Sequence, residues 1–182
     1  NVDAAGRAFR AGLEWKHTVG NPMPIWAGFN ITYLSGDDDT DPNDHKTDRF
    51  AAYGSVIDLM ILEDPYYGFD WDSNYKAVKA YAGAALSVFE GKDNLELSVT
   101  AGITRAAREV GVAPAAEDKL GDEVDFRGRW HLNKQTTLSV SAAYLFGSKI
   151  LEAAMELPGG AGSNPHANDN AFLLVLGVDL DF

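Results

Sequence analysis

Residues 172–182 constrain the fold of this chain more than any other stretch, because their hydrophobicity alternates along the whole segment. Apolar side chains occupy every second position from Phe172 to Phe182, and Gly177, Asp179 and Asp181 lie between them in the second half. A period of two is that of a β-strand with two different faces. One face of this strand is wholly apolar, which is an aggregation liability on a soluble edge strand but suits contact with lipid.

Six further segments alternate in the same way, so we expect an all-β chain with about seven antiparallel strands. These segments are 7–16, 25–34, 76–89, 94–104, 122–132 and 136–147. A membrane-spanning helix is excluded because no run of about 18 apolar residues occurs, whereas a spanning strand needs only ~9–11 residues with alternate ones apolar. The sequence therefore predicts an antiparallel transmembrane β-barrel, with residues 1–182 as a single barrel segment.

A soluble sandwich also alternates, and two features favour the barrel over it. The first is the order of the connections. Short ones at 17–24, 90–93 and 133–135 alternate with long ones at about 35–75, 105–121 and 148–171, and outer-membrane barrels have short periplasmic turns and long external loops. The second is a set of aromatic residues near predicted strand ends, as a membrane-interface girdle requires. These are Trp15, Tyr33, Trp130, Tyr144 and Phe182.

Seven strands are too few for a channel and odd in number, whereas bacterial single-chain barrels close with an even number of strands. A strand within 50–62 would make eight, but it would break the alternation of inside and outside connections. We therefore expect 36–75 to be external loop. We also expect further strands, either N-terminal to this chain or from another chain, to complete a larger barrel.

Charged side chains lie between the apolar ones on several predicted strands. In a barrel this face lines the lumen, where charges can select solutes or pair across strands to hold the wall in shape. Both roles stay open, and the row along 123–131 is mixed in sign. The predicted lumen and selectivity residues are Arg10, Glu14, Lys16, Lys79, Glu96, Glu123, Asp125, Arg127, Arg129 and His131.

Other kinds of site find little support in the sequence. The acidic segment containing Asp37, Asp39 and Asp41 resembles a calcium loop, but Pro42 stands where such loops have Gly, so a solvated loop is the alternative to a Ca²⁺ site. The chain has no cysteine and a net charge of -12, which excludes thiolate metal sites and leaves no basic footprint for nucleic acid. The four histidines show no metal-ligand spacing, and no local catalytic motif occurs. We expect no cofactor and no enzyme activity.

The stretch 31–38, Ile-Thr-Tyr-Leu-Ser-Gly-Asp-Asp, runs from a predicted strand into the acidic loop, and Phe50 and Tyr53-Gly54 follow. This arrangement resembles the alginate-export porin family of Gram-negative outer membranes, and the ending 176–182 resembles outer-membrane proteins generally. The resemblance implies a barrel of about eighteen strands, of which this chain supplies the C-terminal seven. It also implies transport of anionic polysaccharide or small solutes.

The sequence thus predicts a passive porin of the bacterial outer membrane. Its expected partners are outer-membrane lipid and lipopolysaccharide, the missing strands, and the barrel assembly machinery, which would bind the C-terminal strand. Two alternatives remain: a structural barrel that scaffolds a plug or a periplasmic electron carrier, and a small barrel enzyme acting on lipid.

Overall fold

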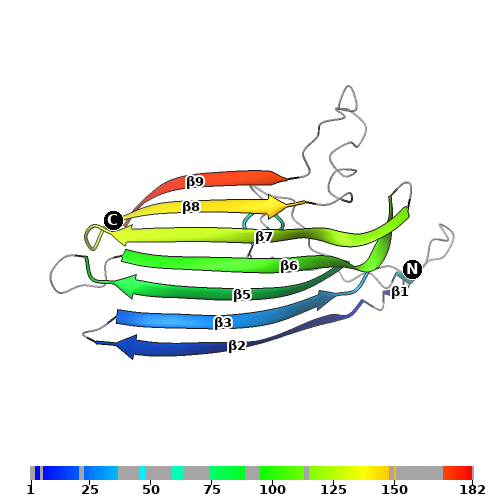
Figure 1. The fold of residues 1–182 in the computed structure, drawn as a ribbon, viewed down its shortest axis with the longest axis horizontal. Helices are drawn as coiled ribbons and strands as arrows, with labels where there is room; N and C mark the ends of the chain where they lie inside the picture. Colours follow the sequence, from blue (N-terminus) through cyan, green and yellow to red (C-terminus); the bar gives the residue numbers. More distant parts are fainter. Residues whose placement is uncertain are drawn as a thin grey trace, which may run out of the picture.

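The computed structural model describes residues 3–4, 6–20, 23–36, 46–47, 59–63, 74–88, 95–112, 115–147, 150 and 170–181. Seven strands form one antiparallel sheet in the order β2-β3-β5-β6-β7-β8-β9 (Figure 1). Their bounds are β2 Ala8–Val19, β3 Met23–Leu34, β5 Tyr75–Leu86, β6 Leu95–Val112, β7 Ala115–His131, β8 Thr136–Phe146 and β9 Ala171–Leu180. Two short strands, β1 (Asp3–Ala4) and β4 (Lys46–Thr47), pair in parallel beside this sheet.

The strands follow one another across the sheet in chain order, and each is antiparallel to its neighbours. This confirms the seven predicted strands and the all-β class. The sheet is open in the part of the chain that the structure describes, with β2 and β9 at its two edges. No helix within the described ranges is long and apolar enough to cross a membrane.

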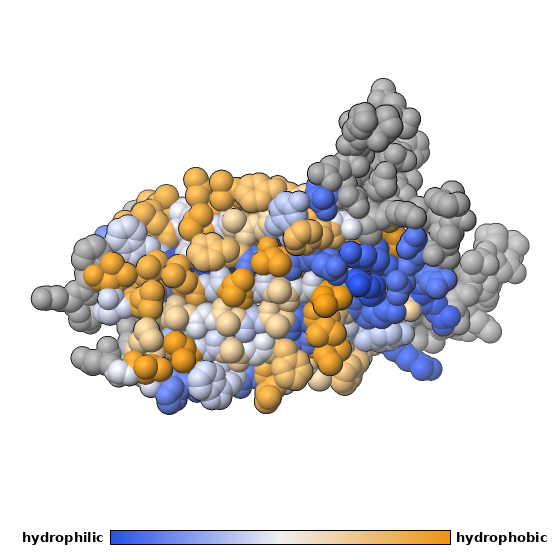
Figure 2. All heavy atoms as spheres, viewed as in Figure 1, coloured by the Kyte–Doolittle hydropathy of each residue, from blue (hydrophilic) through white to orange (hydrophobic). Residues whose placement is uncertain are grey.

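One face of the sheet, called the outer face here, is apolar and exposed. The register aligns like side chains from strand to strand: Phe29 stands opposite Leu13 on β2 and Ala80 on β5. Figure 2 shows apolar residues spread over the strands and hydrophilic residues gathered at the end where β6 and β7 extend. A contiguous apolar surface of this extent marks an interaction with a partner or a membrane. Its exposed members include Phe9, Leu13, Phe29, Val78, Val99, Ile103, Val124, Phe126, Phe172, Leu174, Leu176 and Val178.

The opposite face, called the inner face, carries the polar and charged residues and is partly covered by Leu59–Glu63. We call these five residues the inner segment. Leu59 and Leu62 are fully buried and form one apolar cluster with Ala143 and Leu145 of β8. A second cluster lies near the start of β5 and consists of Tyr75, Ala77, Ala106, Leu120 and Ile150. The buried core of the described residues is therefore on the face that also holds the charges.

The turn between β2 and β3 is tighter than the predicted connection 17–24. The ladder continues to the pairs His17↔Ile25 and Val19↔Met23, so the strands extend into the predicted turn. Gly20 begins the turn with a φ of 67°, in the left-handed region that glycine adopts without steric cost.

The expectation that 105–121 is a loop is wrong, because β6 runs on to Val112 and β7 starts at Ala115. The register shifts between Thr104 and Val110, where β6 has extra residues relative to β7. This irregularity interrupts the alternation of period two, so the sequence pattern hides the strand extension. The Thr104 hydroxyl donates to the Gly121 carbonyl oxygen (2.6 Å), and Arg105 pairs with Asp122 (3.1 Å).

Within the predicted loop 36–75, the inner segment lies against the inner face of the sheet. The loop leaves β3 and returns to β5 at neighbouring points, since Leu34 pairs with Tyr75 and the Asn74 amide donates to the Ser35 carbonyl oxygen (3.3 Å). Most of the third predicted long loop, 148–171, falls outside the described residues.

Candidate inner-face site

The structure places all ten predicted lumen residues on the inner face. In the ladders, Lys79 stands opposite Gly102, which stands opposite Glu123, so these three residues form one row across β5, β6 and β7. Glu96 is likewise opposite Arg129. The shared face is what the alternation predicts, but the surroundings of the ten side chains differ sharply between two regions.

In the first region, two carboxylates of β7 bind the backbone of the inner segment. Glu123 accepts hydrogen bonds from the Ile61 amide (2.6 Å) and the Leu62 amide (2.9 Å), one on each carboxylate oxygen. Asp125 accepts one from the Met60 amide (3.0 Å). A buried backbone amide without an acceptor costs about 1–3 kcal/mol. Three successive backbone amides of the segment, which have no acceptor within the turn itself, thereby gain hydrogen-bond acceptors.

Residues of β5 hold the end of the same segment through Glu63. The Tyr75 hydroxyl donates to Glu63 (2.9 Å), and the Lys79 ammonium forms an ion pair with the same carboxylate oxygen. The other oxygen accepts the Leu59 amide (2.9 Å), which closes the turn. A buried ion pair is favourable only where further hydrogen bonds satisfy its members, as they do here.

We call the five side chains of this network the inner clamp: Glu63, Tyr75, Lys79, Glu123 and Asp125. All five residues are buried, and Lys79 is 1% exposed. The clamp joins β5 to β7 across β6 through the inner segment.

Apolar packing also holds the inner segment against the sheet. Its cluster with Ala143 and Leu145 is extended by the partly buried Leu173 and Val175 of β9. Beneath Leu59 lies Gly102, and a Cβ at Gly102 would stand 2.8 Å from Leu59 Cδ1. Glycine at this point in the row between Lys79 and Glu123 leaves the space that Leu59 fills.

The second region of the inner face, towards the turns that follow β2 and β7, has exposed charges in place of buried ones. We call it the open region, and its charged residues are Glu14, Lys16, Glu96, Arg127, Arg129 and His131. The Lys16 side chain is 72% exposed and pairs with Glu14 at 2.7 Å. His131 Nε2 lies 3.6 Å from Glu96, and Arg127 is 3.8 Å from Asp125 at the border of the clamp. Arg129 is exposed.

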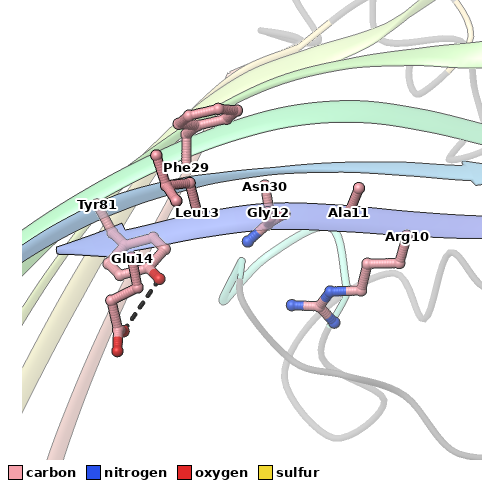
Figure 3. A pocket seen from close by; sticks show the side chains of 8 residues that line it. All are labelled: Arg10, Ala11, Gly12, Leu13, Glu14, Phe29, Asn30 and Tyr81. Atoms are coloured by element: carbon pink, nitrogen blue, oxygen red, sulfur yellow. Dashed lines mark hydrogen bonds between the residues drawn. The ribbon is translucent and has the colours of Figure 1, made fainter.

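A polar pocket of about 360 Å³ lies on the same face beside the β2 edge (Figure 3). Arg10, Glu14 and Asn30 extend from the concave side of the strands, whereas Leu13 and Phe29 point to the other side. The Tyr81 hydroxyl donates to Glu14 (3.1 Å). Its ring covers Gly28, where a Cβ would stand 2.6 Å from the ring, so glycine here lets the ring lie flat on the sheet.

Comparisons with protein-family models, curated proteins and solved structures found no match. The resemblance to the alginate-export porin family therefore stays a prediction from the sequence.

The predicted membrane-interface aromatics lie on the outer face where they are described. Trp15 is 54% exposed, and Tyr33 and Tyr144 are each 38% exposed. Trp130 is half-buried, and Phe182 lies outside the described residues.

The predicted calcium ligands Asp37, Asp39 and Asp41 also lie outside the described residues, so that prediction is untested. Among the residues that are described, no group of three or more His, Asp or Glu side chains is placed to hold a metal ion.

Sequence reasoning missed Glu63, Tyr75 and the inner segment. Residues 59–62 read Leu-Met-Ile-Leu, a continuous apolar run without strand or helix period, inside a long connection rich in polar residues. Such a run in a loop is itself a signal, because an exposed apolar run needs a surface to cover it.

Proposed function

We propose that this chain is part of the wall of an outer-membrane β-barrel channel, through which small or anionic solutes diffuse passively. The observation that carries the proposal is the contrast between the two faces of one sheet. Large aliphatic and aromatic side chains stand exposed on the outer face, and the charged side chains lie on the inner face. A sheet in a barrel wall has lipid on one side and an aqueous or protein-filled interior on the other.

The length of the strands supports this proposal. The shortest strand of the sheet has 10 residues and the longest has 18. A spanning strand needs ~9–11 residues when tilted. Every strand of the sheet is therefore long enough to cross a bilayer, and the extended β6–β7 hairpin would project beyond it.

The two open edges favour a barrel larger than seven strands. In an antiparallel sheet of seven strands, β2 and β9 point in the same direction. Direct pairing of β2 with β9 would be parallel, so antiparallel closure needs an odd number of additional strands. A second copy related by an axis along the barrel would again bring β9 against β2 in parallel. Strands of a different segment thus fit these edges better than a copy of this sheet does.

Cationic side chains of the inner face outside the clamp support passage of anions. Arg127 and Arg129 lie on adjacent inward positions of β7, and Arg10 lines the pocket at the β2 edge. Cationic side chains on a pore wall raise the local concentration of anions.

Conductance in planar lipid bilayers tests the function. The full-length protein is expected to give discrete current steps. In a salt gradient, its zero-current potential is expected to have the sign of an anion-selective channel. The double variant Arg127→Ala, Arg129→Ala is expected to keep the steps and shift this potential towards cations. Absence of steps, or selectivity that does not change in the variant, would reject the proposal.

A second candidate function is a scaffold barrel whose interior is filled. The inner segment favours it, since this segment already covers part of the inner face. Liposome swelling distinguishes the two candidates, because a filled barrel admits no small sugars and an open channel does.

A further inference from the structure

We propose that the inner segment is a fixed constriction of the channel, and that Glu123 and Asp125 are its anchors and not selectivity groups. This inference rests on the proposed channel function. It assigns a positioning role to five side chains, of which the sequence singled out three as lumen charges and missed Glu63 and Tyr75.

The first argument is that the segment covers the two carboxyl groups and donates backbone amides to both. Glu123 is 0% exposed and Asp125 is 1% exposed. Three backbone amides of the segment donate to them at 2.6–3.0 Å. A permeating ion in the water-filled part of the channel would not contact either carboxylate. The charges that such an ion meets are those of the open region.

The second argument is that the segment is held from two sides. Lys79 and Tyr75 of β5 bind Glu63 at its end, and Glu123 and Asp125 of β7 bind the amides before it. Movement of the segment away from the sheet would break the Lys79–Glu63 ion pair and the hydrogen bonds to Tyr75, Glu123 and Asp125 together. It would also expose the buried side chains of Leu59 and Leu62 to water, which is unfavourable. The clamp therefore favours a fixed element over a mobile gate.

The third argument is that the sheet is shaped to receive the segment. Gly102 leaves room for Leu59 in the row between Lys79 and Glu123. The inward side chains Leu173 and Val175 of β9 are apolar, unlike those of the open region, and they pack against the segment. Apolar inward side chains at this end of β8 and β9 suit a surface that is permanently covered.

As a consequence, the water-filled passage of the channel would lie beside the inner segment and not over it. The inner segment covers the inner face of β5 to β9 at the level of Lys79 and Glu123. At this level water and solutes would pass along the pocket at the β2 edge, and beyond it they would pass along Arg127 and Arg129. Solute size would be limited by the segment, and solute charge by the open region.

Conductance of anchor variants separates the two roles of the carboxylates. The double variant Glu123→Gln, Asp125→Asn is expected to raise the mean single-channel conductance and the current noise, because side-chain amides replace acceptors of the segment. Its zero-current potential is expected to stay at the wild-type value. The matched control is Glu96→Gln, an accessible carboxyl on the same face, which is expected to shift the potential towards anions with unchanged conductance.

The opposite pattern would overturn the inference. If Glu123 and Asp125 were selectivity groups, their neutralisation would shift the potential towards anions and leave the conductance and the noise unchanged.

Thiol labelling tests whether the inner segment stays packed on the sheet, in variants that leave the five clamp side chains unchanged. The chain has no cysteine, so Leu62→Cys and Lys16→Cys each introduce a single thiol. With a water-soluble maleimide, the Leu62→Cys variant is expected to react at least about tenfold more slowly than Lys16→Cys, because reaction requires local opening. Equal rates would contradict a fixed segment. Failure of the channel function would instead appear as wild-type protein without current steps, whatever the labelling rates.

Discussion

The inner clamp and the open region carry the same kinds of side chain on the same face of one sheet, yet their environments are opposite. Lys79 in the clamp is 1% exposed and paired with a buried carboxylate, whereas the Lys16 side chain is 72% exposed and paired with an exposed one. Both lysines have the same inward parity. The difference arises from Leu59–Glu63, which covers one region and leaves the other open.

This comparison separates what alternation determines from what it does not. Parity decides which face a side chain occupies. The environment of that side chain depends on a segment that reaches the sheet from a loop. Charged residues on the same face can therefore be structural in one region and available to solutes in the other.

The largest expected difference between the regions is in the free energy of unfolding of two lysine variants. Lys79→Ala leaves Glu63 buried without its cation and is expected to reduce stability by about 3–5 kcal/mol. Lys16→Ala removes an exposed charge and is expected to leave stability unchanged. Guanidinium unfolding in lipid vesicles, followed by tryptophan fluorescence, measures both. Equal midpoints for the two variants would show that the clamp carries no stability.

The next largest effect concerns the outer face, which the proposal places in lipid over both regions. Val124→Arg puts a charge among exposed apolar side chains and is expected to cost about 2–4 kcal/mol if the site is near the bilayer midplane. The control Thr100→Arg places the same side chain on the inner face of neighbouring β6, where we expect a much smaller loss. The same vesicle unfolding assay applies, and equal losses would argue against lipid on the outer face.

The smallest effect compares two tyrosines of β5. Tyr75→Phe removes the hydroxyl that donates to buried Glu63 and is expected to cost about 1.5–3 kcal/mol at most, because the acceptor is charged. Tyr81→Phe removes the hydroxyl that donates to exposed Glu14 and should not change the unfolding midpoint. A larger loss for Tyr81→Phe than for Tyr75→Phe would reverse the assignment of the two regions.

The sequence predicted the strands and the face of each side chain because period-two alternation is local and holds over most of each strand. It failed at 105–121, where the irregular pairing of β6 with β7 breaks the period. It also failed for Glu63 and Tyr75, whose partnership depends on a loop returning to the sheet.

The same limit explains why the sequence leaves the roles of Glu123 and Asp125 open between solute selection and a structural role. Their inward parity follows from the sequence, but the amides that bind them belong to residues about 60 positions earlier in the chain. No pattern of period two reports a contact of that kind.

The most direct test of the central claim, that the sheet has lipid on one face and water on the other, is single-cysteine labelling along β7. Val124→Cys, Phe126→Cys, Arg127→Cys and Arg129→Cys would each be reconstituted in vesicles and exposed to a water-soluble maleimide. The account predicts that the variants at 127 and 129 react and that those at 124 and 126 are protected. Equal labelling at all four positions would contradict it.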